Sequence, residues 1–186
     1  MDEPRIIELD ARTLRAMAHP LRLRMLGLLR VEGPATATSL AARLGESSGT
    51  TSWHLRQLAE HGLIEEDPER GNRRERWWRA VHRYTRIPYA KFVDDPENTG
   101  AVSTFLHESM SIYYRKATTF IADLPSWSRD WLEAAIFSDD EMPLTPDELR
   151  AMRADLLEVK RRYLRDPRPG DEPVVFQLQV FPRRHP

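Results

Sequence analysis

The segment from Ser47 to Gly62 combines residue types that suit contact with duplex DNA. Its first turns hold small, uncharged or basic residues, and no carboxylate occurs from Ser47 to Gln57. A carboxylate there would be repelled by DNA phosphates, whereas Thr, Ser, Gln and Arg side chains form hydrogen bonds with phosphates or base edges. The segment therefore predicts a helix that docks against nucleic acid. The alternative is a Ser/Thr-rich helix that is merely solvated.

Local signals predict where this helix begins and ends. Ser47, or the serine after it, suits the N-cap because its side-chain oxygen can accept from a backbone N–H that otherwise lacks a partner. Leu55, Leu58 and Ala59 recur at helical spacing and predict the inward face. Gly62 suits the helix end, where the backbone commonly turns left-handed.

An arginine-rich segment follows the helix. From Arg70 to Arg86 the chain has seven arginines and one acid, Glu75. Gly71-Asn72 predicts a hairpin turn, with Leu63–Glu66 and Trp77–Val81 as its strands. Arginine on a protruding ribbon suits contact with phosphates or with the minor groove. A solvated basic loop explains the charge but not its position directly after the helix.

These elements have the order of a helix-turn-helix with a β-wing. A short helix from Thr36 leads to a tight turn at Gly45 and then to the helix at Ser47–His61. We expect the second helix to lie in the major groove and the wing to lie beside it. The residues expected to contact DNA are Ser48, Thr50, Thr51, Ser52, Trp53, His54, Arg56, Gln57, Arg70, Asn72, Arg73 and Arg74.

Three features together resemble the ArsR-type winged helix-turn-helix repressors. They are Arg15–Leu26 (RAMAHPLRLRML), Ser52–Leu63 (SWHLRQLAEHGL) and the arginine-rich wing. The resemblance spans about Leu9 to Val81. It implies a cytoplasmic, homodimeric transcriptional regulator that binds a palindromic operator in double-stranded DNA through the Ser47–His61 helix.

Metal sensing, which the resemblance also suggests, does not fit this chain. Metalloid sensors of the family use a cysteine pair at the start of the recognition helix, and this chain has no cysteine. Other members use His and carboxylate pairs on a C-terminal helix, where this chain offers only His107-Glu108. We expect no metal and no cofactor, and any effector must act without a thiolate.

Charge and composition agree with this interpretation. The formal net charge is −1, but residues 1–92 hold 16 Lys and Arg against 12 Asp and Glu, whereas residues 93–186 hold 12 against 17. The basic half coincides with the expected DNA-binding domain. No signal peptide or membrane-spanning stretch is evident, so the cytoplasm is the expected location.

The sequence predicts two domains. Residues 1–92 form a winged helix-turn-helix, and residues 93–186 form a dimerisation helix with a regulatory subdomain. The upstream scaffold needs a helix capped by Asp10 and another that begins at Pro20, with His19 as a packed or capping residue rather than a ligand. The charged segment Asp94–Glu97 looks like the boundary. Apolar residues at helical spacing then predict a dimerisation helix at Gly100–Leu124.

The last third predicts a small α/β subdomain. Thr145–Glu148 forms a capping-box pattern with Pro at the first helical position, which predicts a helix to about Arg165. Alternation in Pro173–Pro182 predicts a strand, and Ala135–Leu144 is the candidate for its partner. The expected fold class is mainly α with small β.

Aromatic residues of this region allow two interpretations. They line a pocket for a small-molecule effector, or they form core and dimer interface. The residues are Tyr113, Tyr114, Phe120, Trp127, Trp131 and Phe137. The acidic run Asp139–Glu141 suggests a solvated turn more than a cation site, because calcium-loop spacing is absent.

Two other classes of function fit the sequence less well. No phosphate loop, nucleophile elbow or metalloprotease motif supports an enzyme. A winged-helix protein-interaction module without DNA binding has no need for a carboxylate-free helix beside seven arginines. We therefore expect a DNA-binding regulator with no catalytic residues.

Overall fold

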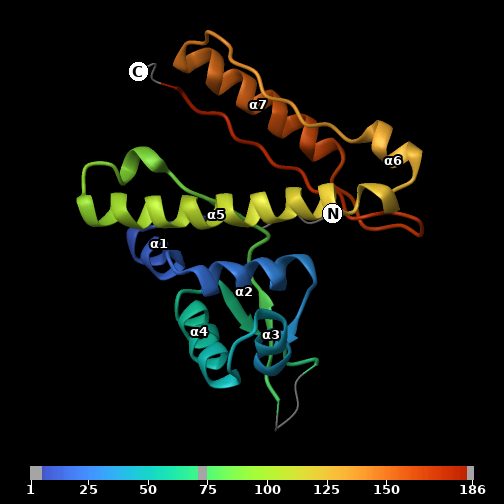
Figure 1. The fold of residues 1–186 in the computed structure, drawn as a ribbon. Helices are drawn as coiled ribbons and strands as arrows, with labels where there is room; N and C mark the ends of the chain where they lie inside the picture. The colour runs from blue at the N-terminus through green and yellow to red at the C-terminus, as the bar shows by residue number, and fades with distance from the viewer. Residues whose placement is uncertain (1–5, 71–74, 184–186) are drawn as a thin grey trace. The chain divides into compact units, whose positions relative to one another are not determined.

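The computed structural model describes residues 6–70 and 75–183 (Figure 1). Its helices are α1 (Ala11–Met17), α2 (Pro20–Val31), α3 (Ala37–Leu44), α4 (Ser48–Glu60), α5 (Pro96–Ala122), α6 (Arg129–Ala134) and α7 (Pro146–Arg162). Its strands are β1 (Ile6–Glu8), β2 (Ala35–Thr36), β3 (Ile64–Glu66), β4 (Trp77–Ala80) and β5 (Tyr84–Arg86), and η1 (Tyr89–Lys91) and η2 (Leu124–Ser126) are short 3₁₀ helices. The expected fold class, mainly α with small β, is confirmed.

The chain divides into two compact units, residues 1–115 and 116–186. The division falls within α5, so the expected boundary after residue 92 lies inside the first unit. All elements of the winged helix-turn-helix belong to that unit.

Capping side chains fix the first two helices. Asp10 accepts a hydrogen bond from the Thr13 N–H at 2.7 Å and begins α1. His19 accepts from the Leu21 N–H through Nδ1 at 3.2 Å and begins α2, with Pro20 as its first residue. Pro suits that position because its missing N–H would have no partner in the helix. The capping role expected for His19 is confirmed.

The turn between α3 and α4 forms where the sequence predicts it. Thr36 and Ser39 make a reciprocal capping box at the start of α3. Gly45 then turns the backbone left-handed at φ 70°, which costs glycine little. Ser47 caps α4 by accepting from the Thr50 N–H at 3.0 Å. In Figure 1, α3 and α4 lie side by side below α2.

The wing hairpin forms a three-stranded antiparallel sheet in the order β2-β4-β3. Ile64 pairs with Ala80 and Glu66 with Trp78, which confirms the two expected wing strands. The third strand, β2, pairs Ala35 with Trp78 and was not expected. It holds the start of α3 against the base of the wing. A second sheet, in which β1 pairs in parallel with β5, was also not expected.

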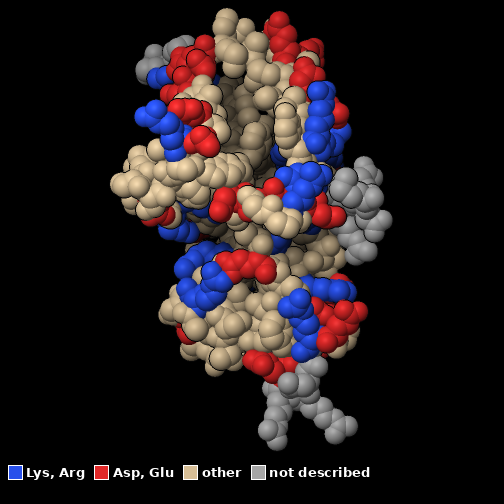
Figure 2. All heavy atoms as spheres, turned by 90° about the vertical axis from the view of Figure 1, so that its right-hand side faces the viewer, with Lys and Arg blue, Asp and Glu red and all other residues tan. Residues whose placement is uncertain are grey.

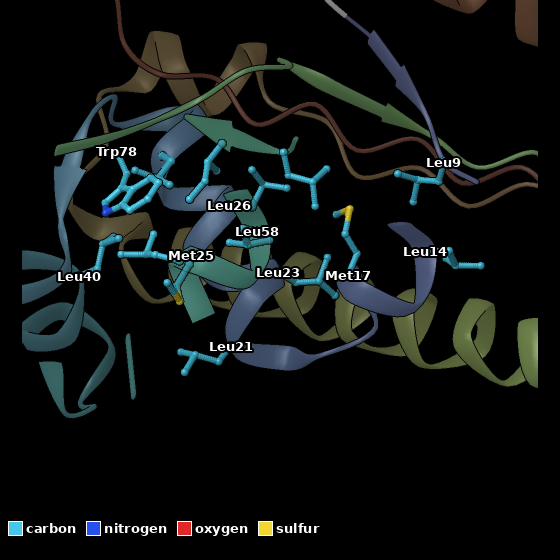
Figure 3. Close-up of a cluster of buried hydrophobic side chains, with 14 of the residues drawn as sticks. Leu9, Leu14, Met17, Leu21, Leu23, Met25, Leu26, Leu40, Leu58 and Trp78 are labelled. Carbon is cyan, nitrogen blue, oxygen red and sulfur yellow. The ribbon is translucent and has the colours of Figure 1, made fainter. Parts of the chain in front are cut away.

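One apolar core joins α2, α3, α4 and the wing sheet (Figure 3). Met25, Leu55 and Leu58 are fully buried in it, and Trp78 covers it from β4. The expected inward face of α4 is therefore confirmed for both leucines. Burial of side chains of this size stabilises the fold by about 1.5–3 kcal/mol each.

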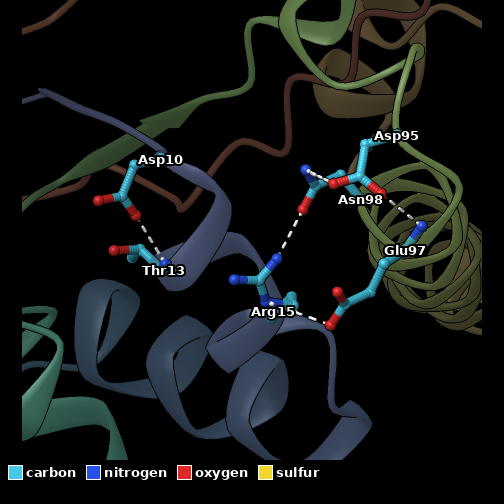
Figure 4. Close-up of polar contacts among 6 residues, drawn as sticks. All are labelled: Asp10, Thr13, Arg15, Asp95, Glu97 and Asn98. Carbon is cyan, nitrogen blue, oxygen red and sulfur yellow. Dashed lines mark hydrogen bonds and ion pairs between the residues drawn. The ribbon is translucent and has the colours of Figure 1, made fainter.

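Polar contacts join α1 to the start of α5 (Figure 4). The Arg15 guanidinium donates to Asn98 Oδ1 at 2.8 Å and lies 3.6 Å from Glu97. Asn98 in turn donates to Asp95 at 2.8 Å, and the other Asp95 oxygen accepts from the Glu97 N–H. The segment Asp94–Glu97, which looked like the domain boundary, therefore contains the start of a helix with Pro96 as its first residue. The sequence Asp95-Pro96-Glu97 carries the signal for this helix start, because Pro and acidic residues favour the first turn of a helix.

The second unit differs from the expected α/β subdomain. The capped helix at Thr145 is confirmed as α7, with Thr145 Oγ1 accepting from the Glu148 N–H. The strands expected at Pro173–Pro182 and Ala135–Leu144 are absent, because residues 116–183 form no strand. Val174 is 73% exposed, so alternation alone did not provide the paired, half-covered surface that a strand needs.

Aromatic rings of the second unit contact one another at its surface. Phe120 stacks on Phe137 at 5.9 Å and lies 6.3 Å from Trp127. Trp127 meets Trp131 edge-on at 6.4 Å. Phe137 is nevertheless 67% exposed, so this cluster is not a closed core.

Leu55→Ala should lower the free energy of unfolding by about 2–5 kcal/mol, because it opens a cavity beneath α4. Val31→Ala is the matched control, since Val31 is 72% exposed and should cost less than about 0.5 kcal/mol. Urea unfolding followed by circular dichroism measures both. Equal effects for the two variants would contradict the core position of Leu55.

Candidate nucleic-acid interface

The outer face of α4 carries most of the residues expected to contact DNA. Ser48, Thr50, Trp53 and Arg56 are exposed, and Trp53 is 51% exposed although it is large and aromatic. Ser52 is half-buried at the edge of this face. The face has hydrogen-bonding groups, one aromatic ring and one cation, without a carboxylate.

Two of the expected contact residues, Thr51 and His54, point inward instead. Thr51 is fully buried and its hydroxyl donates to the Ser47 carbonyl at 2.9 Å. His54 is 5% exposed. The prediction that they contact DNA is therefore wrong for this conformation. The signal was present in the sequence, because both residues continue the inward helical face of Leu55 and Leu58 by one turn.

Gln57 lies at the edge of the outer face and is already engaged. Its side-chain N–H donates to the Glu60 carboxylate at 3.0 Å. Because this contact engages the donor side of the Gln57 amide, a contact with adenine through both amide groups requires the Glu60 contact to rearrange. Glu60 is exposed at the end of α4, one turn beyond the carboxylate-free segment.

A polar cleft of about 540 Å³ lies between α3, α4 and the wing. Arg56 and Ser52 enter it from α4, and Arg76 enters it from the wing. The start of α3 forms another wall, where backbone N–H groups of the first turn lack helical partners. The lining residues are Thr36, Ala37, Thr38, Ser52, Arg56, Glu75, Arg76 and Trp78.

The wing sheet pairs its arginines with carboxylates across the strands. Arg79 donates to Glu65 at 2.9 Å, and Arg76 lies 3.2 Å from Glu66. Both pairs are largely exposed, and such pairs contribute little to stability. They reduce the positive charge of the wing below what a count of seven arginines suggests.

Arg70 lies at the end of the described part of the wing. It is 3.8 Å from the buried carboxylate of Asp67, and its guanidinium lies 5.9 Å from the centre of the Trp77 ring. Three further residues expected to contact DNA, Asn72, Arg73 and Arg74, lie outside the described residues.

Charge is mixed on the face shown in Figure 2, where basic and acidic side chains are interspersed rather than gathered in one patch of a single sign. This face therefore presents local basic groups to DNA rather than a broad basic field.

Arg30 connects the wing to α2. Its Nε donates to the His82 carbonyl at 2.8 Å and its Nη2 to the Thr85 hydroxyl at 2.9 Å. Burial lowers the pKa of Arg30 to about 10, so the side chain stays charged at neutral pH. The guanidinium satisfies backbone and hydroxyl acceptors after β4 and so ties the end of α2 to the segment that follows the wing.

Comparison with known proteins agrees with this geometry. Residues 17–67 match a family described as a helix-turn-helix domain, a span that includes α2, α3, α4 and β3. The chain contains a helix-turn-helix domain. The matched family is described only as a helix-turn-helix domain, so the match selects no narrower family.

Comparison with curated proteins and with solved structures does not narrow the family further. No curated protein matches the chain. Among solved structures, the chain is similar to the apo form of a double mutant of Lactococcus lactis ZitR, with 15% identity over 79% of this chain and 84% of that one. The TM-score is 0.36, a likeness too low to extend the assignment.

The described residues contain neither a metal-binding cluster nor a membrane-spanning helix. Among residues 6–70 and 75–183, no three His, Asp or Glu side chains are grouped so as to hold a metal ion. In the same part of the chain, no helix is long and apolar enough to cross a bilayer.

Arg56→Ala should weaken binding to random duplex DNA at low salt and reduce the slope of log K against log salt by about one unit, because one phosphate contact is lost. Arg153→Ala, an exposed arginine on α7, is the matched control and should leave the slope unchanged. Fluorescence anisotropy titrations at several salt concentrations measure both. A wild-type slope in the Arg56 variant would remove Arg56 from the interface.

Proposed function

We propose that the protein is a dimeric transcriptional regulator of ArsR type that binds a palindromic operator in double-stranded DNA. The observation that carries this proposal is the outer face of α4 from Ser48 to Gln57, which is free of carboxylates and stands beside the cleft lined by Arg56 and Arg76. The helix-turn-helix match supports the same function. The regulator acts as a repressor in this proposal, and its signal is one that needs no thiolate.

The outer face of α4 enters the major groove in this proposal. Ser48, Thr50 and Ser52 offer hydroxyl groups near its start, which is the part of a recognition helix that reaches base edges. Trp53 is exposed beside them and packs on the sugar-phosphate backbone. Thr51 and His54 are excluded from this set because they are buried.

The cleft suits a backbone phosphate. Arg56 and Arg76 both line it, and the first turn of α3 supplies N–H groups that favour an anion. Glu75 also lines the cleft and disfavours an anion there, so we expect Arg76 to leave Glu66 for the phosphate on binding.

An anisotropy titration of the full chain with random duplex DNA at low salt tests the proposal as a whole. A DNA-binding regulator should bind with an affinity that falls steeply as salt rises. The wing ion pairs Arg79–Glu65 and Arg76–Glu66 would instead suit a winged-helix module that binds proteins, since they neutralise the arginines. Absence of binding at low salt would favour that module.

The α5 helix is the proposed dimer interface because it has two apolar faces. Val102, Phe105 and Ile112 pack on the core of the first unit. On a different face, Met110 is 37% exposed and Tyr114 is 71% exposed. A two-fold dimer through this second face would present two copies of α4 to DNA, as half-sites about one helical turn apart require.

Met110→Glu combined with Tyr114→Glu should convert the dimer to a monomer, because two charges would be buried in an apolar interface. Ser111→Glu, at an exposed position about 100° around the helix from Met110, is the matched control. Sedimentation velocity measures the mass of each variant. A dimer that persists in the double variant would place the interface elsewhere.

Gln57→Ala tests base reading separately from phosphate contact. Its amide can pair with adenine in two hydrogen bonds, so the variant should lose about 1–3 kcal/mol on the operator and little on random DNA. The operator is obtained by selection from a random duplex library. Glu60→Gln is the control, because it removes the acceptor charge that holds Gln57 while leaving the amide available. Equal losses on both DNAs would reduce Gln57 to a backbone contact.

A further inference from the structure

Two histidine rings meet beneath the recognition helix. His19 precedes α2 and His54 lies on the inner face of α4, and their ring centres are 4.4 Å apart at an angle of 48°. His54 also contacts the exposed Trp53 ring edge-on at 4.7 Å. The pair thus links the start of α2 to the part of α4 proposed to face DNA. Neither the helix-turn-helix assignment nor the proposed base contacts uses it.

The cap at the start of α2 requires a neutral His19. Its Nδ1 accepts the Leu21 N–H, so the lone pair on that nitrogen is already in use. A proton on Nδ1 would convert the acceptor into a donor and break the cap. The resulting cation would also stand at the positive end of the α2 dipole, which disfavours it further.

His54 is enclosed in surroundings that oppose a positive charge. It is 5% exposed, and its Nδ1 has no hydrogen-bond partner among the described residues. Arg22 of α2 is a cation near both rings, and its buried Nε likewise has no partner in the described part of the chain. A proton on His54 would therefore add a buried cation close to another cation.

The carboxylates near the pair only partly offset these effects. Glu46 of the turn before α4 acts on both rings, and Glu108 of α5 acts on His19. Burial, followed by Arg22, lowers the pKa of His19. Burial, followed by His19 and Arg22, lowers the pKa of His54. Both histidines are therefore neutral at pH 7.

We propose that the His19–His54 pair is a proton-sensitive latch that holds α4 on α2 only while both imidazoles are neutral. Proton uptake breaks the cap, separates the rings and loosens α4 from the core. The effect on DNA rests on the proposed function, because a loosened α4 no longer presents a fixed outer face to the groove. Acidification then releases the operator.

The direction of the pH effect follows from linkage. The folded-state pKa of each histidine lies below its unfolded value of about 6.5. Below about pH 6.5 the unfolded or loosened state binds more protons than the latched state. The latched state therefore loses stability as pH falls. The loss grows until pH passes below the folded-state pKa. Above about pH 6.5 the latch is fully closed.

The sign distinguishes this latch from ordinary charge effects. Histidines near DNA add positive charge when they are protonated, and that tightens DNA binding at low pH. If the latch exists, DNA binding by the wild-type chain should instead weaken at low pH. His54→Phe keeps an aromatic ring against His19 and Trp53 but cannot take up a proton. His107→Gln, at an exposed position on α5, is the matched histidine control.

Thermal melting of the full chain from about pH 8 to about pH 5 tests the latch without DNA. The melting temperature of wild type and of His107→Gln should fall on acidification by several degrees more than that of His54→Phe. His19→Asn, which retains an N-cap side chain without an imidazole, should also reduce the fall. Equal falls in all variants, or a His54 pKa at or above about 6.5 by NMR titration, would overturn the latch.

Anisotropy with a random duplex of about three helical turns tests the link to DNA at constant low salt. Wild type should bind at least about threefold more weakly at the acidic end, whereas His54→Phe should bind equally or more tightly. Tightening of wild type to the same degree as His54→Phe would overturn that link. If no variant binds at any pH, the proposed function fails, and the melting series still decides whether the latch exists.

Discussion

The inner face of α4 is the constraint on which the interface depends. Leu55 and Leu58 are fully buried between α2, α3 and the wing sheet, and Thr51 closes the same face one turn earlier. A helix held on one side in this way cannot rotate without exposing those leucines, at a cost of about 1.5–3 kcal/mol each. The direction in which Thr50, Trp53 and Arg56 point is therefore set by residues that never approach DNA.

The same constraint explains which contacts could be predicted from sequence. Caps, turns and the inward leucines depend on a few neighbouring residues, so Ser47, Gly45 and the α4 face were predicted correctly. Thr51 and His54 were misplaced because their polarity was read as exposure. Their spacing from Leu58 already assigned them to the buried face, and helical geometry outweighed residue type.

Features that depend on distant partners were beyond such reasoning. The count of wing arginines from Arg70 to Arg86 left out Glu65 and Glu66, which come earlier in the chain. These two carboxylates pair with Arg79 and Arg76 across the sheet. The strand expected at Pro173–Pro182 failed for a related reason. Its alternation met the local requirement, yet residues 116–183 offer no strand to pair with it, and Val174 stays exposed.

The α5 helix carries the proposed dimer interface and also a charged group that acts on the latch. One of its faces packs on the core through Phe105, and its first turn is bound to α1 through Asn98 and Arg15. Glu108, on the same helix, is one of two carboxylates, with Glu46, that favour a proton on His19. A partner or ligand that moved α5 away from His19 would remove that favourable charge and lower the pKa of His19 further. The latch would then stay closed to a lower pH, so the position of α5 sets part of the pH dependence of the latch through the charge of Glu108.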